Sequence, residues 1–500
     1  MLLLLCCIAA VIIGNKNLPS DLILKTIGEP PYKQESIEKL LDLYKDRGFI
    51  QAKVIAQEDR LIIQEGTCFR VGNIKLQGNK SFTEDEILLS FKTKKGKIFN
   101  ESEFEEDMDN LLTRYENIGY PFAKIEPVDF SLDSARVNFG LRISEGPLTK
   151  IGEIEVEGNR ITKDYVIIRE MRLNKGDIFS QKNIVDGKKR IEKLGFLSVE
   201  NVELRGLPGD PEKIGIVIKV AENQTNHLLG ILGYRKGRVS GLLDIKIPNL
   251  FGTGRTITFR LEKPSPLTSS LNLSYNEPWI LGFPVNAVLE IYNRTEEPDY
   301  ILTKVAATLD APILAYLSML AGLTFRKALF HEEYNGFLGV HLDTRNPSFF
   351  ARKGTRLVLG SEYDLQGLTR IKINLDNFIP LSAKYGLFFS VNGGEIMEDT
   401  NLVYDEFRVG GAKTLRGYDE DEFHGTRVAW TNFEFSRLLG EKTSAFIFQD
   451  IGYINNMWKM GYGLGITADS KIGVIKLTYG LAKGKSLSEG KIHIEVVSTF

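Results

Sequence analysis

The sequence predicts a chain with two parts: an α+β array of repeated units, followed by an all-β antiparallel barrel of sixteen strands that spans a membrane. Three observations lead to this fold class. The same pattern of strands and helices begins at residue 71 and again at residue 151. From about residue 225, strand-like alternation replaces helical spacing. The longest apolar run is too short for a membrane-spanning helix.

Composition excludes several classes of protein. Of the 500 residues, 43% are hydrophobic and 26% are charged, which is typical of globular proteins and not of disordered or collagen-like chains. The 63 basic and 65 acidic residues leave a formal charge of -2. Because no basic field surrounds such a chain, the sequence predicts no nucleic-acid partner.

The chain opens with twelve apolar residues, Leu2 to Ile13, whereas a helix needs about 20 to cross a bilayer. This run has the length of a secretory h-region and is followed by Gly14, Asn15 and Lys16. We therefore expect residues 1–14 to be a cleaved signal peptide, and the alternative is a buried first strand. Removal of such a leader would leave Cys68 as the single cysteine, which excludes an intramolecular disulfide.

Residues 69–148 and 149–223 carry the repeat. Each copy begins with alternating apolar and polar residues before a Gly-Asn turn, which predicts a strand. A first helix begins at Thr83, three residues before Glu86, in the spacing of a capping box, and its counterpart begins near Thr162. Apolar residues at helical spacing predict the second helix: Met108, Leu111, Leu112 and Tyr115 in one copy and Ile184, Ile191 and Leu194 in the other. Two strands close each unit.

A shorter copy lies upstream. Residues 21–68 reproduce the second half of the unit, and the first helix is expected to be missing. The order strand, helix, helix, strand, strand resembles the POTRA domain, a periplasmic module that passes or docks polypeptides. The resemblance covers residues 21–223, with two good copies and one degenerate copy.

The alternating pattern of residues 225–500 predicts the barrel. Segments of about ten alternating residues recur there, as in Thr369 to Asn377, where Ile371 and Ile373 interleave with charged residues. About sixteen such segments lie between His227 and Phe500. An even number of strands closes an antiparallel sheet with both ends on one side.

A soluble all-β domain would alternate in the same way, but the aromatic residues favour a membrane barrel. They lie near the ends of the predicted strands, where girdles at the lipid–water boundary form: Tyr275, Trp279, Phe283, Tyr292, Tyr300, Phe349, Phe350, Tyr385, Phe388, Phe389, Tyr453 and Trp458. The last segment ends at Phe500. Such a terminal aromatic strand resembles the sorting signal of bacterial outer-membrane barrels.

The most specific motif lies in a long connection from about Glu395 to Phe423. Leu415-Arg416-Gly417-Tyr418 resembles the V-R-G-Y loop signature of the BamA and TamA superfamily of outer-membrane assembly barrels, with leucine in place of valine. Phe448-Gln-Asp450-Ile-Gly452 resembles the F-x-D-x-G strand element of the same superfamily. The resemblance implies that the loop enters the lumen and that Arg416 meets Asp450.

Physical chemistry gives these residue types a reason. The planar guanidinium of Arg416 can bind a carboxylate through two parallel hydrogen bonds. Gly417 lets the backbone turn close to the wall, and Gly452 removes a side chain where the loop docks. The alternative is that Arg416 is exposed and Asp450 is an ordinary turn residue. Such a pair would lock a loop and perform no chemistry.

Three further stretches resemble the superfamily, although Gly and Asn-Pro favour ordinary hairpin turns as well. Asn249, Phe251, Gly252 and Gly254 match its early periplasmic turn. Tyr275 to Trp279 match the strand end that follows, and Asp343 to Phe350 match an element in the middle of the barrel.

Enzyme signatures are not found in the sequence. The five histidines form no i, i+4 pair, and no G-x-S-x-G nucleophile motif occurs. Gly484-Lys485-Ser486 lacks the spacing of a phosphate-binding loop. We expect a protein without catalytic residues, metal or cofactor.

The resemblance implies a bacterial outer-membrane protein with its repeats in the periplasm, acting in outer-membrane protein assembly or translocation. Its expected partners are unfolded outer-membrane or secreted client proteins, periplasmic or inner-membrane accessory subunits, and the lipid bilayer. The first strand, about His227 to Lys236, would meet the last, about Lys491 to Phe500, at a seam able to open. A two-partner-secretion transporter and a passive porin or surface-binding barrel are the alternatives.

Overall fold

The structure is a computed structural model. It describes residues 11–28, 32–57, 60–235, 238–314, 316–328, 331–345, 353–364, 368–397, 404, 406–440, 443–470 and 473–499. The chain divides into two compact units, which are described separately. The first takes in residues up to 155, 172–186 and 202–217, and the second takes in 156–171, 187–201 and 218–500.

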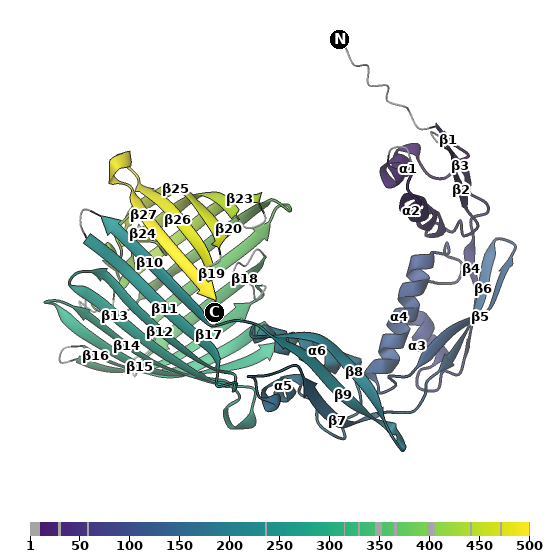
Figure 1. The fold of residues 1–500 in the computed structure, drawn as a ribbon, viewed down its shortest axis with the longest axis horizontal. Coiled ribbons are helices and arrows are strands. Elements are labelled where there is room, and N and C mark those ends of the chain that lie inside the picture. The colour runs from purple at the N-terminus through teal and green to yellow at the C-terminus, as the bar shows by residue number, and fades with distance from the viewer. Residues whose placement is uncertain are drawn as a thin grey trace, which may run out of the picture. The chain divides into compact units, whose positions relative to one another are not determined.

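Three small sheets with the same strand order precede the barrel: β1-β3-β2, β4-β6-β5 and β7-β9-β8 (Figure 1). Their strands are β1 (Val11–Ile13), β2 (Lys53–Gln57), β3 (Arg60–Gln64), β4 (Arg70–Gln77), β5 (Lys124–Asp133), β6 (Arg136–Ser144), β7 (Lys150–Glu157), β8 (Leu197–Leu207) and β9 (Asp210–Glu222). The helices are α1 (Ser20–Ile27), α2 (Gln34–Lys45), α3 (Glu84–Ser90), α4 (Glu101–Asn117), α5 (Asp164–Met171) and α6 (Gln181–Lys193). In each repeat the strands and helices follow the order β-α-α-β-β.

The first repeat is complete, so the expectation of a missing first helix is wrong. Helix α1 occupies that place, and β1 pairs in parallel with β3 through Val11, Ile12 and Ile13. Strands that pair in parallel are often continuously apolar, and β1 forms the end of the apolar run from Leu2 to Ile13. For this reason its residues resembled the end of a secretory leader. The expected leader of residues 1–14 overlaps this strand, which is paired but not buried, since Val11 and Ile13 are exposed. Residues 1–10 lie outside the described part.

A glutamate fastens the turn after the first strand of each repeat. In the second repeat, the backbone N–H groups of Lys80 and Ser81 donate to Glu145 Oε1 at 2.6 and 2.7 Å. Burial raises the pKa of this carboxyl, but the hydrogen bonds from Ser81 and Lys80 lower it by more, so it lies below its usual value. Glu65 and Glu222 accept the corresponding backbone N–H bonds in the other two repeats.

Successive repeats are joined by the same contact. The backbone N–H of Ser102 in α4 donates to Asp46 Oδ1 at 3.1 Å, and that of Lys182 in α6 donates to Asn117 Oδ1 at 2.7 Å. The end of the second helix in one repeat therefore caps the second helix of the next.

Sixteen strands form a closed barrel within the described residues, as the fold-class prediction stated (Figure 1). They are β10 (His227–Arg235), β11 (Arg238–Leu250), β12 (Arg255–Ser265), β13 (Thr268–Glu277), β14 (Asn286–Glu296), β15 (Tyr300–Leu314), β16 (Leu317–Ala328), β17 (His331–Asp343), β18 (Gly354–Tyr363), β19 (Leu368–Pro380), β20 (Tyr385–Ile396), β23 (Arg427–Gly440), β24 (Thr443–Ile454), β25 (Met457–Ser470), β26 (Gly473–Ala482) and β27 (Lys491–Thr499). Two short 3-10 helices, η1 (Ile280–Gly282) and η3 (Leu487–Glu489), lie in connections. Among the helices described, none combines the length and apolar character needed to cross a membrane.

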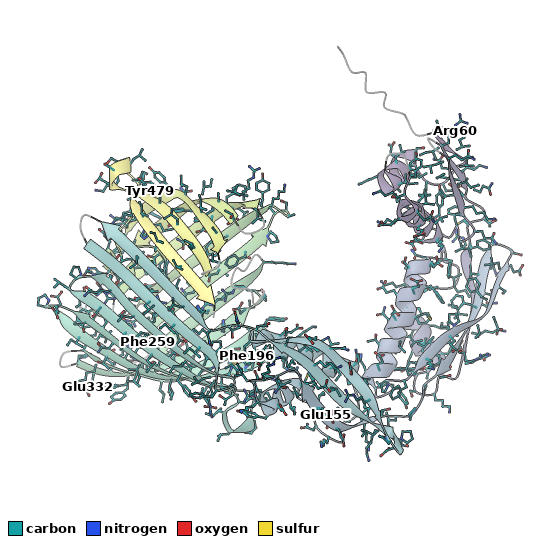
Figure 2. All side chains as sticks on the ribbon, viewed as in Figure 1. Arg60, Glu155, Phe196, Phe259, Glu332 and Tyr479 are labelled. Carbon is teal, nitrogen blue, oxygen red and sulfur yellow. The ribbon has the colours of Figure 1, made fainter. Side chains whose placement is uncertain are left out.

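The barrel wall has an apolar outer face and a polar inner face. On β19, Ile371 is 39% exposed, whereas its neighbour Arg370 is buried on the inner side. Figure 2 shows side chains projecting from the wall, with Phe259 of β12 labelled among them. Alternation along each strand therefore places charged groups in the lumen and apolar groups outside.

Candidate functional site: the loop inside the barrel

The connection between β20 and β23 forms the candidate site. Within it, β21 (Phe407–Val409) and β22 (Phe423–Gly425) pair antiparallel and enclose residues 410–422. Val409 and Leu415 are fully buried, together with Val428 and Ile454 of the barrel wall. The loop therefore packs on the inside of the barrel as part of its core.

The structure brings Arg416 and Asp450 together. Arg416 donates from Nε to Asp450 Oδ2 at 2.8 Å and from Nη2 to Oδ1 at 2.6 Å. The backbone N–H of Arg416 also donates to Asp450 Oδ2, at 2.9 Å. Arg416 is 4% exposed and Asp450 is 0% exposed. The two parallel bonds form the bidentate geometry that the planar guanidinium allows.

Other groups around Arg416 balance its charge. Its Nη1 also bonds Glu434, and Lys476 Nζ lies 3.3 Å from the same Glu434 oxygen. The guanidinium carbon lies 3.7 Å from the centroid of the Phe448 ring. Two cations and two carboxylates therefore form a neutral cluster, which limits the free-energy cost of burying these charges. We call Arg416, Glu434 and Asp450 the near anchor.

The remaining motif residues shape the backbone around the near anchor. A Cβ at Gly452 would lie 2.5 Å from Leu415 Cδ1, so the missing side chain makes room for the larger residue that replaces valine. Gly417 has a φ of 96°, and a Cβ there would lie 2.6 Å from the carbonyl carbon of Leu481. Tyr418 donates its hydroxyl to the Met460 carbonyl at 3.1 Å.

The early turn between β11 and β12 contacts helix α5, which belongs to the same compact unit as the barrel. The Lys163 N–H donates to the Gly252 carbonyl at 2.9 Å, and Asn249 Nδ2 donates to Thr162 Oγ1 at 2.8 Å. A Cβ at Gly252 would lie 1.9 Å from the Ile161 carbonyl oxygen.

Two other residues of this turn lie differently. The Gly254 N–H donates to Asn249 Oδ1 at 2.8 Å and so closes the turn. Phe251 is 81% exposed. The turn therefore uses its polar and glycine residues for docking, and not its aromatic residue.

The following strand end, the predicted stretch from Tyr275 to Trp279, also reaches α5. Trp279 donates from Nε1 to Glu170 Oε1 at 2.6 Å. Its partner Glu170 was not predicted from the sequence. The mid-barrel element has its own pair: Arg345 donates to Asp343 from Nε at 3.0 Å and from Nη2 at 2.8 Å. Its residues 346–350 lie outside the described part.

The seam is paired in this structure. Strands β10 and β27 match in an antiparallel register from His227–Thr499 to Tyr234–Ile492, which makes eight residue pairs. The β14–β15 pairing on the other side of the barrel has eleven. Phe500, the expected sorting signal, lies outside the described residues.

No group of three or more His, Cys, Asp or Glu side chains in the described part of the chain is arranged to hold a metal ion. The arrangement at the near anchor provides hydrogen bonds and ion pairs that hold a loop in place.

Comparison with known proteins begins with the repeats. The sequence model of the POTRA family, described as "Surface antigen variable number repeat", matches residues 69–146 and 149–223. The chain is also 25% identical over 333 residues to the outer membrane protein assembly factor BamA of Neisseria meningitidis. This match covers 62% of the chain and 40% of that relative, so the chain spans less than half of the relative's length.

Two solved structures show the same fold. BamA from Haemophilus ducreyi lacking POTRA domains 1–3 aligns with a TM-score of 0.58 at 17% identity, covering 87% of this chain and 100% of that one. CdiB from Escherichia coli aligns with a TM-score of 0.55 at 14% identity, covering 93% and 97%. Both alignments extend over most of this chain and support the fold described above.

Proposed function

Because this chain belongs to the superfamily of BamA- and TamA-like outer-membrane assembly barrels, we propose that it is an outer-membrane protein assembly factor. It receives unfolded clients on its periplasmic repeats and assists their insertion into, or passage across, the outer membrane. The observation that carries the proposal is the lumen loop locked to the wall by Arg416 and Asp450 in a barrel that follows POTRA repeats. The work requires no covalent chemistry.

The edges of the repeat sheets supply the client-binding surface. In the strand order β4-β6-β5, β5 is an edge strand, and most of its residues are exposed. An extended client can add to such an edge through main-chain hydrogen bonds, which do not depend on side-chain sequence. This mode of binding suits many different clients.

The seam is the place where a client strand would form. The eight pairs between β10 and β27 are fewer than the eleven between β14 and β15, but β26 and β27 share only seven, so it is the joining of the first and last strands that distinguishes the seam. An opened β27 offers its main chain as a template for a client strand. The free energy of insertion comes from burying the apolar face of the client in lipid, so no nucleotide is needed.

The proposal is tested with the full-length chain in liposomes and a urea-denatured barrel protein as client. Folding of the client is followed by its heat-dependent migration on gels. The full-length chain should accelerate folding, and deletion of residues 11–223 should abolish the acceleration while the barrel still conducts ions. Equal rates with and without the repeats would indicate a passive pore, and activity confined to one secreted partner would indicate a dedicated transporter.

A further inference from the structure

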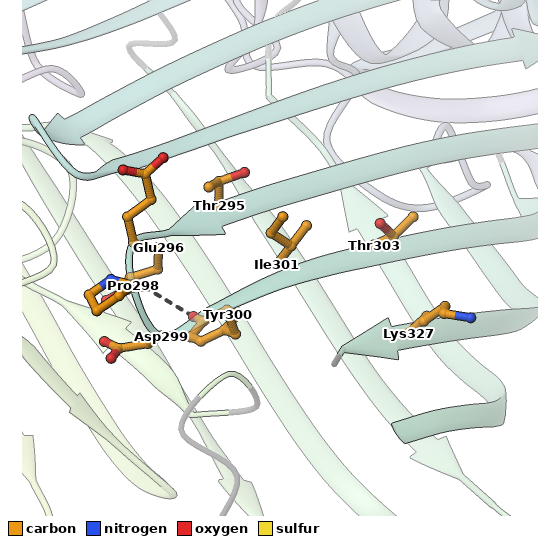
Figure 3. A pocket seen from close by; sticks show the side chains of 9 residues that line it. Thr295, Glu296, Pro298, Asp299, Tyr300, Ile301, Thr303 and Lys327 are labelled. Carbon is orange, nitrogen blue, oxygen red and sulfur yellow. Dashed lines mark hydrogen bonds between the residues drawn. The ribbon is translucent and has the colours of Figure 1, made fainter. Parts of the chain in front are cut away.

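The lumen loop is held at a second place, far from the near anchor. Arg408 of β21 donates from Nη2 to the Tyr300 hydroxyl at 2.6 Å, and the same nitrogen lies 2.8 Å from Glu296 Oε2. Arg294 of β14 donates from Nη2 to Asp421 Oδ2 at 3.0 Å. We call these five residues the far anchor. Figure 3 shows its hairpin, with Glu296 and Tyr300 joined by a hydrogen bond at the end of β14 and the start of β15.

The order of strands places the two anchors on opposite walls. In the closed ring, β14 is the fifth strand and β24 is the thirteenth, so they stand eight places apart in a ring of sixteen. Asp450 lies on β24 and Arg294 lies on β14. The loop is therefore tied to two facing sides of the barrel and crosses the lumen between them.

The two anchors differ in burial. The carboxylate of Asp450 is 0% exposed, whereas the side chains of Glu296 and Asp421 are 21% and 27% exposed. Water and salt screen the ion pairs of the far anchor more strongly than those of the near anchor. The far anchor is the one that releases first.

The backbone around the near anchor reinforces this difference. A Cβ at Gly461 would lie 2.0 Å from the Arg416 carbonyl oxygen, so the main chain of the loop rests directly on β25 there. The contacts that define the far anchor join side chains of the loop to side chains of the wall. After the far anchor breaks, the loop remains attached on the side of the near anchor, where Tyr418 also bonds the Met460 carbonyl.

The loop also holds the last strand of the barrel. Lys491 at the start of β27 forms ion pairs with Asp419 and Glu422, which lie between Arg416 and β22. Asp419 and Glu422 flank Asp421 of the far anchor. The same stretch of loop therefore connects the wall at β14 with one side of the seam.

We propose that Arg294 and Arg408 are positioning residues that hold the loop across the lumen, and that release of the far anchor lets residues 419–422 swing on the near anchor and open the lumen. The hold on the lumen goes beyond the proposed function and does not depend on it. Only the consequence for client insertion, a looser grip on β27, rests on the proposed function.

Single-channel recording of the full-length chain in planar bilayers tests this proposal without any client. Arg294→Ala and Asp421→Ala should each make open events about tenfold more frequent, the effect of losing one charged hydrogen bond. The double variant should open no more often than the stronger single variant. Arg294→Asp combined with Asp421→Arg should restore the closed state.

A matched control comes from the same wall. Asp376→Ala breaks the Arg356–Asp376 ion pair, whose atoms lie 3.6 Å apart on β18 and β19, and it should leave the opening frequency unchanged. Raising the salt concentration should open the unmodified barrel more often and the Asp421→Ala variant no further.

Two results would overturn the proposal: an unchanged opening frequency in Asp421→Ala, or additive effects in the double variant. Heat-dependent migration on gels shows whether each variant is folded, and Asp421→Asn, which keeps the side-chain shape, answers the question if the alanine variant does not fold. Client assembly is measured separately on the same variants. A changed opening frequency with normal client assembly would support the far anchor while contradicting its role in insertion.

Discussion

Arg416 shows how a buried charge is tolerated at the scale of one residue. Its guanidinium bonds two carboxylates and lies over an aromatic ring, so nearly all of its lost hydration is replaced. A buried charge of this kind depends on each partner. Removal of one partner leaves the other buried and uncompensated, which costs more than removal of both.

We expect Arg416→Ala and Asp450→Ala each to destabilise the loop by about 3–5 kcal/mol and to weaken assembly by the same route. The double variant should lose less than the sum of the two, and exchange of the two charges should restore part of the function. The temperature at which the folded form disappears from the gel measures the stability of each variant. Arg345→Ala is the control, because it breaks a bidentate pair with Asp343 outside the loop. Additive losses would contradict the expectation.

Glu145 links the stability of the second repeat to pH. Because its pKa in the folded chain is below the usual glutamate value, it stabilises the repeat above that value, about 4.3. This stabilisation is lost as the pH falls through the lowered folded pKa. Glu145→Gln should cost about 1–3 kcal/mol at pH 7 and should flatten the loss of stability below pH 5.

Circular dichroism measures this effect selectively, because the α-helices of the described chain all lie between Ser20 and Lys193. Thermal unfolding followed by the helical signal therefore reports on the repeats and not on the barrel. Glu153→Gln, a change on the exposed face of β7, serves as the control. An equal pH slope in Glu145→Gln and the unmodified chain would contradict the assignment.

The sequence identified the near anchor but not the far anchor, and the reason lies in spacing. Arg416 and Asp450 stand in short motifs with fixed neighbours. Arg294, Arg408 and Asp421 are single charged residues whose meeting depends on strand register and on the path of the loop across the lumen. Neither can be read from local sequence.

At the scale of elements, the first helices of the second and third repeats begin differently. In α3 the Thr83 N–H is bonded by its own Glu86, at 2.8 Å, in a capping box. The equivalent residues before and in α5 are Lys163 and Val166, 80 positions later. Because the apolar side chain of Val166 cannot accept a hydrogen bond, the Lys163 N–H donates to the Gly252 carbonyl of the barrel turn instead.

Gly252→Ala should break this contact. The residue has a φ of 73°, and its new Cβ would meet the Ile161 carbonyl oxygen, so we expect a loss of about 1–3 kcal/mol. Faster amide hydrogen exchange over residues 161–171 would report it. Gly484→Ala is the matched control, since Gly484 has a φ of 84° but no atom within 4 Å of the added Cβ. Equal exchange in both variants would contradict a specific contact.

Prediction of the elements succeeded where the periodic pattern was long and failed where it was short. Helix α4 has 17 residues, and the barrel strands alternate over about ten each, so both patterns were clear. Strand β1 has three residues within an apolar run, and α1 has eight residues after Pro19. These short elements are set by packing against Leu61 and Leu40 in the core of the first repeat, which local sequence does not show.

At the scale of the whole molecule, the barrel closes where its first strand, β10, pairs with its last, β27. The outward side chains Leu232 and Ile494 face each other across it, and they are register partners. Paired residues on neighbouring strands have Cα atoms about 4.5–5.5 Å apart, which a disulfide can span.

Leu232→Cys with Ile494→Cys, in a chain with its own three cysteines changed to serine, should therefore form a disulfide that holds the seam shut. We expect client assembly to stop under oxidising conditions and to recover with reductant, while heat-dependent migration persists. Leu273→Cys with Ile291→Cys places the same bond between β13 and β14 and should leave assembly intact. Full activity of the oxidised seam variant would rule out opening at this place.

Helices α3 and α5 differ at their N-terminal ends, and this difference determines which repeat can lie next to the barrel. The contact that joins one repeat to the next is the same at both junctions, so a repeat could be added or lost in the series without redesigning its neighbours. The repeat next to the barrel is not interchangeable with the others. Its first helix must leave the N–H before its first turn free to donate to the carbonyl of the barrel turn. The number of repeats is therefore free to vary in evolution, while the identity of the final repeat is constrained by the barrel that follows it.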